Sequence, residues 1–67
     1  MVCYVNNSEH EVADNQWLAD LLASLGQTQT RGLAVAINDV VVPRAEWARH
    51  AVQPHDRLTL IRATQGG

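Results

Sequence analysis

The chain has 67 residues, a hydrophobic content of 46% and a formal net charge of −2, which is typical of one small globular domain. Its five basic residues are scattered, whereas nucleic-acid binding needs a concentrated basic face, so we expect no nucleic-acid partner. No apolar run approaches the roughly 20 residues that cross a bilayer, and no secretory signal is visible. We therefore expect a cytoplasmic, monomeric protein without membrane contact.

The single cysteine, Cys3, limits the chemistry of the chain. It excludes an internal disulfide, an all-cysteine metal site and an iron–sulfur ferredoxin, which needs four thiolates. The three histidines have no spacing typical of metal ligands, so we expect no metal site. Cys3 shares one face of a predicted strand with Val5, which favours a small buried apolar residue over a sulfur donor.

The chain begins with a predicted β-hairpin. Val2–Asn6 is rich in strand-forming residues, and Glu9–Val12 returns as a short polar strand. The turn between them is Asn6-Asn7-Ser8, in which asparagine tolerates a positive φ and serine bonds locally.

A helix is predicted from Asn15 to Leu25. Asp14 is a suitable N-cap, because its carboxylate can accept hydrogen bonds from the amides of the first turn. Gly26 follows at the position where a left-handed cap is expected. The apolar side chains recur at helical spacing and predict one buried stripe: Trp17, Leu18, Leu21, Leu22 and Leu25.

The second half of the chain predicts three strands and a short helix. Leu33–Ile37 is apolar on both faces, as expected for a central strand, and the tight turn Asn38-Asp39 leads into a strand at Val40–Val42. Ala45–His50 predicts one or two helical turns around Trp47, which, like Trp17, we expect in the core. In Arg57–Arg62 the residues alternate, with Leu58 and Leu60 on the core face.

The order of elements predicts an α+β fold with one domain. One helix packed on a mixed sheet of about five strands buries one apolar stripe and one sheet face, with a short extra helix beside it. We expect the first and last strands to lie side by side at the centre of the sheet. Residues 1–64 then form the domain, and residues 65–67 form a flexible C-terminal tail that extends the central strand.

The tail ends in Gly66-Gly67. A terminal glycine pair leaves a carboxylate on an unbranched stem that can pass through a narrow active site. Chance produces such a pair in about one chain in two hundred. The pair therefore gains meaning only from the domain that presents it.

A longer pattern accompanies this tail. Residues 34–38 read Ala-Val-Ala-Ile-Asn, and residues 41–44 read Val-Val-Pro-Arg, with Trp47 following. With the terminal glycines, this pattern resembles the ubiquitin-like β-grasp family and, within it, the sulfur carriers of thiamine (thiazole) biosynthesis. The chain departs from the usual family pattern at His55, where a glycine is common, and at Asn7, where the first turn is often Asn-Gly.

The resemblance implies a carrier protein rather than an enzyme. Gly67 would be the covalent site, adenylated by an E1-like adenylyltransferase that uses ATP and then converted to a thiocarboxylate. A cysteine desulfurase or a persulfide carrier would donate the sulfur, and thiazole synthase would receive it. Gly66 and Gln65 would form the tail, and the carrier would bind no cofactor of its own.

Three further residues are candidate partner contacts. Ile61 is an apolar residue on the strand face opposite Leu58. It is either an anchor for a docking partner or an ordinary half-exposed strand residue. Arg62 is suited to an acidic partner groove, and a solvated charge explains it equally well. Arg44 either stabilises the turn after Pro43 or contacts a partner.

Three other functions remain open on the sequence. The first is a sulfur carrier of another pathway, such as the small subunit of molybdopterin synthase. The second is a ubiquitin-like modifier that forms isopeptide bonds. The third is a β-grasp binding module in which the glycines are incidental.

Overall fold

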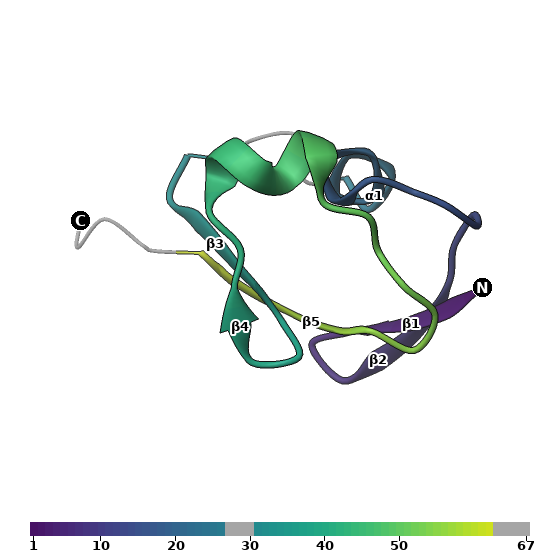
Figure 1. The fold of residues 1–67 in the computed structure, drawn as a ribbon. Helices are drawn as coiled ribbons and strands as arrows, with labels where there is room; N and C mark the ends of the chain where they lie inside the picture. Colours follow the sequence, from purple (N-terminus) through teal and green to yellow (C-terminus); the bar gives the residue numbers. More distant parts are fainter. Residues whose placement is uncertain (27–30, 63–67) are drawn as a thin grey trace.

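The computed structural model describes residues 1–26 and 31–62. Its elements are β1 (Val2–Val5), β2 (Ser8–Glu11), α1 (Leu18–Ser24), β3 (Leu33–Ile37), β4 (Val40–Val41), the 3₁₀ helix η1 (Arg44–Arg49) and β5 (Arg57–Arg62) (Figure 1). Within these ranges no helix is long and apolar enough to cross a membrane.

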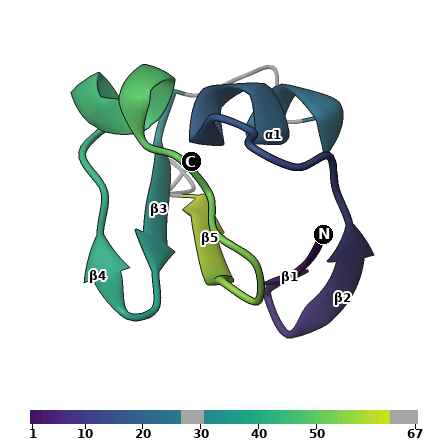
Figure 2. The same cartoon turned by 45° about the vertical axis from the view of Figure 1, so that its right-hand side comes forward.

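The strands form one mixed sheet with β5 at its centre. The order is β2-β1-β5-β3-β4; β1 pairs with β5 in parallel, and the other neighbouring pairs are antiparallel. Helices α1 and η1 lie on the same face of the sheet (Figures 1 and 2). This arrangement confirms the α+β prediction, including the neighbouring first and last strands.

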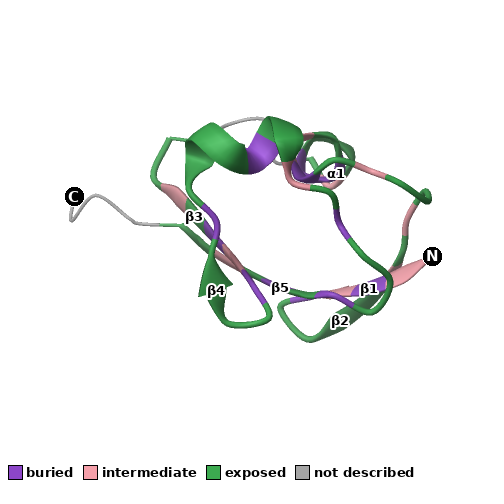
Figure 3. Ribbon diagram, viewed as in Figure 1, coloured by how far each residue is buried: buried purple, intermediate pink, exposed green. Residues whose placement is uncertain are grey.

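The core lies between the sheet and the two helices (Figure 3). Leu18, Leu21 and Leu22 of α1 are each at most 1% exposed, and Leu58 of β5 is equally buried. Trp47 of η1 is also buried, and its indole Nε1–H donates to the Val42 carbonyl at 2.9 Å. The predictions of a leucine stripe and of a core Trp47 are therefore confirmed.

Two hairpin turns have both central residues at positive φ. The φ angles are 49° and 71° at Asn6 and Asn7, and 50° and 69° at Asn38 and Asp39. Turns of this kind match the twist of the flanking strands, and asparagine and aspartate tolerate them best after glycine. His55, in the turn before β5, also has a positive φ, of 68°. The chain therefore keeps left-handed turns at the positions where it departs from the family pattern.

A polar cluster fixes the start of β5. The carboxylate of Asp56 is 8% exposed and accepts from the Asn38 Nδ2–H at 3.0 Å and from the Gln53 N–H at 2.8 Å. The Asn38 Oδ1 in turn accepts from the Arg57 N–H at 3.0 Å. These bonds connect the β3–β4 turn with the first residue of β5.

The helix is shorter than predicted. It begins at Leu18 with Trp17 as N-cap, and no side chain caps it. Asp14 accepts instead from the Met1 ammonium at 3.0 Å, and Asn15 has a φ of 58°, which is incompatible with a right-handed helix. Gly26, at a φ of 82°, ends the helix as predicted.

Two burial predictions are wrong. Trp17 is 46% exposed, because it precedes the helix and forms an isolated bridge with Ala51. Ala34 of β3 is exposed, because no described element covers the second face of the sheet. Strand β3 therefore lies inside the sheet, but the helices cover only one of its two faces.

We predict that Asp56→Ala destabilises the fold by about 2 kcal/mol, because it leaves two partly buried donors without their charged acceptor. The control is Glu9→Ala, which removes an exposed carboxylate on β2 and should change stability by less than about 0.5 kcal/mol. Urea unfolding followed by circular dichroism measures both values. Equal stabilities for the two variants would show that the Asp56 cluster does not hold β5.

Candidate functional site

The predicted covalent site lies outside the described residues. Gly67, Gly66 and Gln65 belong to residues 63–67, as does the proposed boundary between the domain and the tail. The structure describes the strand that leads to them, β5, up to Arg62. The site is therefore analysed through the surroundings of the second half of β5.

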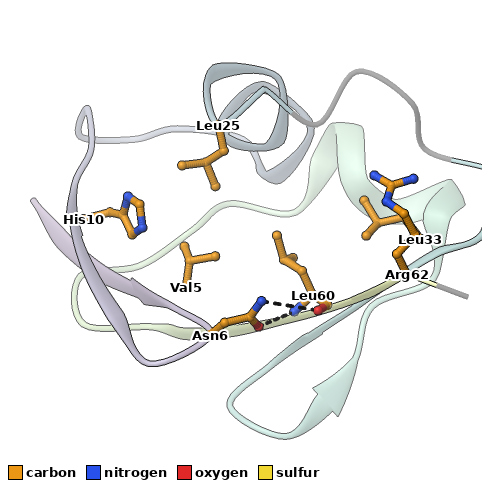
Figure 4. A pocket seen from close by; sticks show the side chains of 7 residues that line it. All are labelled: Val5, Asn6, His10, Leu25, Leu33, Leu60 and Arg62. Atoms are coloured by element: carbon orange, nitrogen blue, oxygen red, sulfur yellow. Dashed lines mark hydrogen bonds between the residues drawn. The ribbon is translucent and has the colours of Figure 1, made fainter.

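Strand β5 has different neighbours along its two halves. On one side it pairs with β3 from Ile37↔Leu58 to Leu33↔Arg62. On the other side the parallel pairing with β1 stops at Val5↔Leu58. Beyond that point the side chain of Asn6 contacts the backbone of Leu60: its Oδ1 accepts from the Leu60 N–H at 2.9 Å, and its Nδ2–H donates to the Leu60 carbonyl at 3.4 Å (Figure 4).

An apolar patch occupies the uncovered face of the sheet. Ile61 is 60% exposed, and its cross-strand neighbour is the exposed Ala34. Ala36 follows on the same face of β3 and lies opposite Val41 of β4, which is 70% exposed. We call these four residues the open-face patch. Because the two alanines are small, Ile61 and Val41 stand above their surroundings, as in a docking surface.

The structure does not bring the three predicted contact residues together. Ile61 lies in the open-face patch, whereas Arg62, the next residue along the strand, lines a pocket on the helix-covered side. The Arg62 Nη1–H donates to the Arg31 carbonyl at 3.5 Å. Arg44 is exposed at the first position of η1, on a different element. Ile61 alone is therefore part of an apolar surface.

The pocket beside Asn6 has a volume of about 280 Å³. It lies between β5, β1, β2 and the end of α1, as the close view shows (Figure 4). Its lining combines apolar and polar side chains: Val5, Leu25, Leu33, Leu60, Asn6, His10 and Arg62. From the sequence, Asn6 is predicted only as a turn residue, and its contact with Leu60 is not predicted.

Cys3 is buried in the core at 0% exposure. Burial raises the pKa of its thiol, and the negative charge of Asp56 raises it further. Since the thiolate is the reactive form, the prediction of an inert apolar residue agrees with this environment. Among residues 1–26 and 31–62, no group of three or more His, Cys, Asp and Glu side chains could hold a metal ion.

Known proteins resemble this chain over its whole length. A model of the ThiS family matches residues 2–67. The sulfur carrier protein ThiS of Escherichia coli (strain K12) is 40% identical over 62 residues, and the match covers 92% of each chain.

Two solved structures from Geobacter metallireducens have the same fold. The crystal structure of its thiamine biosynthesis protein ThiS matches with a TM-score of 0.87 and 25% identity over the full length of both chains. The solution structure of a thiamine biosynthesis protein from this organism matches with a TM-score of 0.79 and 25% identity, over all of this chain and 88% of the other. The five-stranded sheet with its helix is therefore the ubiquitin-like β-grasp fold that the sequence predicts.

We predict that native Cys3 reacts with Ellman's reagent at least about a hundredfold more slowly than the thiol of the unfolded chain, because reaction requires the core to open. The measurement is the absorbance of the released thiolate at neutral pH, with and without denaturant. Rapid reaction of the native protein would contradict the buried, protonated thiol and would make Cys3 a candidate sulfur site again.

Proposed function

The chain belongs to the ThiS family, and on this premise we propose that it carries sulfur for thiamine biosynthesis as a thiocarboxylate on Gly67. The observation that carries the proposal is the family match over residues 2–67, which includes the terminal Gly66-Gly67. The identity of 40% to the curated carrier of Escherichia coli supports the same role. In this role the chain is a co-substrate of partner enzymes and binds no cofactor of its own.

The chemistry follows from the low reactivity of a carboxylate. An E1-like adenylyltransferase joins the Gly67 carboxylate to the α-phosphate of ATP and releases pyrophosphate. The product is a mixed anhydride with AMP as a good leaving group. With sulfide as the donor, sulfur forms a bond to the carbonyl carbon, the bond to AMP breaks, and a thiocarboxylate remains. With a cysteine desulfurase or a persulfide carrier as the donor, the terminal sulfur of the persulfide bonds to the carbonyl carbon as AMP leaves, which gives an acyl disulfide. A second thiol then attacks the donor sulfur, forms a disulfide with it and releases the thiocarboxylate, which thiazole synthase receives.

The central position of β5 supports this role. Residues of β5 are held by β3 on one side and by β1 and Asn6 on the other, so the domain gives the terminal segment a fixed starting point. Gln65 and Gly66 then connect that starting point with Gly67. A carrier needs such a support, because its partners must find the carboxyl group at a defined distance from the docking surface.

We further propose the open-face patch as the docking surface for the activating enzyme. Ile61 lies at the β5 edge of the patch, six positions before Gly67 in the chain. A partner that covers Ile61 and Val41 buries apolar surface close to the emerging tail. Arg62 and Arg44 add positive charge at other sides of the domain, where acidic partner groups can pair with them.

We predict that the protein, incubated with ATP, an E1-like adenylyltransferase and sulfide, gains the mass that corresponds to replacement of one oxygen by sulfur. Removal of Gly67 should abolish this gain while the circular dichroism spectrum stays unchanged, because the truncation removes the carboxyl group on the proposed carrier residue. Intact-mass spectrometry measures both chains.

The control for this experiment is Cys3→Ala, which removes the only thiol and should leave the mass gain intact. Sulfur transfer to the truncated chain would overturn the proposal. Transfer only with a molybdopterin-pathway partner would assign the carrier to that pathway, and adducts on lysines of other proteins would indicate a modifier.

We predict that Ile61→Asp raises the KM of the activating enzyme for the carrier at least about tenfold, because it replaces a large exposed apolar side chain of the contact with a charge. The matched control is Val40→Asp, which changes an apolar residue of 67% exposure outside the patch. Steady-state kinetics of AMP formation give both KM values. A KM for Ile61→Asp equal to that of the control would exclude the patch as the docking surface.

A further inference from the structure

We propose that Asn6 is a positioning residue whose side chain replaces a missing strand beside Leu60 and so holds the end of β5 in the geometry that partner enzymes require. The proposal rests on the proposed function, because it concerns the delivery of Gly67. It assigns to a turn residue at the opposite end of the sequence a role in presenting the C-terminus.

Strands β1 and β5 are joined by a parallel series of backbone hydrogen bonds. Tyr4 N–H donates to the Asp56 carbonyl, and Asn6 N–H donates to the Leu58 carbonyl, each at 2.9 Å. In a parallel ladder, the residues that form successive backbone hydrogen bonds are two positions apart on each strand. The next two bonds would therefore join Leu60 N–H to the carbonyl of residue 6, and the N–H of residue 8 to the Leu60 carbonyl.

The backbone cannot make these two bonds. At Asn6 and Asn7 the φ angles are positive, and the chain turns away from β5 into β2. The Asn6 side chain makes them instead: its Oδ1 takes the place of the residue 6 carbonyl, and its Nδ2–H takes the place of the residue 8 amide. One amide side chain thus completes the ladder one step beyond the end of the strand (Figure 4).

Strand β3 does not offer a substitute at this position. Val35 lies opposite Leu60, but its carbonyl accepts from the Val42 N–H at 2.9 Å, on the β4 side. The backbone groups of Leu60 face the other way, toward the pocket that Asn6 lines. Without the Asn6 amide these groups would face the pocket and water, and the end of β5 would be bonded to the sheet through β3 alone.

This contact matters for the proposed chemistry because Leu60 lies seven positions before Gly67. Each residue that separates from the sheet adds conformational freedom that a partner must remove again when it binds the terminus. The open-face patch includes Ile61, directly after Leu60, so the same bond also fixes the proposed docking surface. Asn6 therefore holds the chain to the sheet at Leu60, directly before the proposed docking residue Ile61.

The test is Asn6→Gly, because glycine accepts the positive φ and loses only the amide. Asn7→Gly is the matched control in the same turn, since Asn7 has a positive φ and is not the residue that bonds to Leu60. In the free protein, Asn6→Gly should make hydrogen exchange of the Leu60 amide about tenfold faster, the order expected for the loss of one or two net hydrogen bonds. The exchange of the Tyr4 amide, which donates to the Asp56 carbonyl in the same ladder, should change by less than about twofold.

The functional readout is kcat for carrier-dependent AMP formation at a saturating concentration of carrier. We expect kcat to fall about tenfold for Asn6→Gly and to stay at the wild-type value for Asn7→Gly. Leu22→Val lowers the stability of the core but removes no hydrogen bond of the Leu60 backbone, and its kcat should stay unchanged while the protein is folded.

Three results would overturn the proposal: an unchanged Leu60 exchange rate, an unchanged kcat in Asn6→Gly, or an equal fall of kcat in Leu22→Val. Failure of the proposed function is distinct, because the wild-type chain would then form no adenylate at all. The hydrogen-exchange result would still decide whether the Asn6 amide holds the end of β5.

Discussion

The pairing of β1 with β5 is the interaction on which the rest of the structure depends. It places the last strand of the chain between two others, so that the strand nearest the C-terminus is also the centre of the sheet. In a domain of 67 residues the core is small, and the central strand contributes Leu58 to it, with Leu60 packed against it. Leu58, in the middle of this arrangement, is 1% exposed.

The single helical layer has a second consequence. Helices α1 and η1 cover one face of the sheet, and no described element covers the other. The apolar residues of the uncovered face are therefore available to a partner, and they lie on β5, its neighbour β3 and the edge strand β4. The central position of β5 and the exposure of the proposed docking surface thus follow from the same architecture: one side chain of β5 enters the core, and the next one faces outward.

Local sequence patterns predicted most of the fold, because the alternation and the runs of apolar residues depend only on neighbouring positions in the chain. The strict alternation in Arg57–Arg62 and the apolar run Leu33–Ile37 gave both strands with their observed bounds. The start of the helix was predicted wrongly, because the partner of Asp14 is the Met1 ammonium, and the pairing of these two groups depends on the tertiary structure. Trp17 fits the helical stripe in sequence, but the left-handed Asn15 places it before the helix.

The contact of Asn6 with Leu60 is a second feature that local sequence patterns could not predict. An asparagine in a turn is explained by its tolerance of positive φ, and nothing in its neighbours indicates a further contact. Its partner, Leu60, is 54 positions away, and the contact depends on the register between β1 and β5. The tail itself was identified from residues alone, because the chemistry of a terminal Gly-Gly does not depend on a register.

The most direct test of the account is to locate the sulfur. The protein is isolated from its own cells during thiamine synthesis and fragmented intact in a mass spectrometer. The account predicts that the C-terminal fragments that contain Gly67 carry sulfur in place of one oxygen, and that fragments containing Cys3 have an unmodified thiol. Added sulfur on Cys3, with an unmodified Gly67, would contradict it.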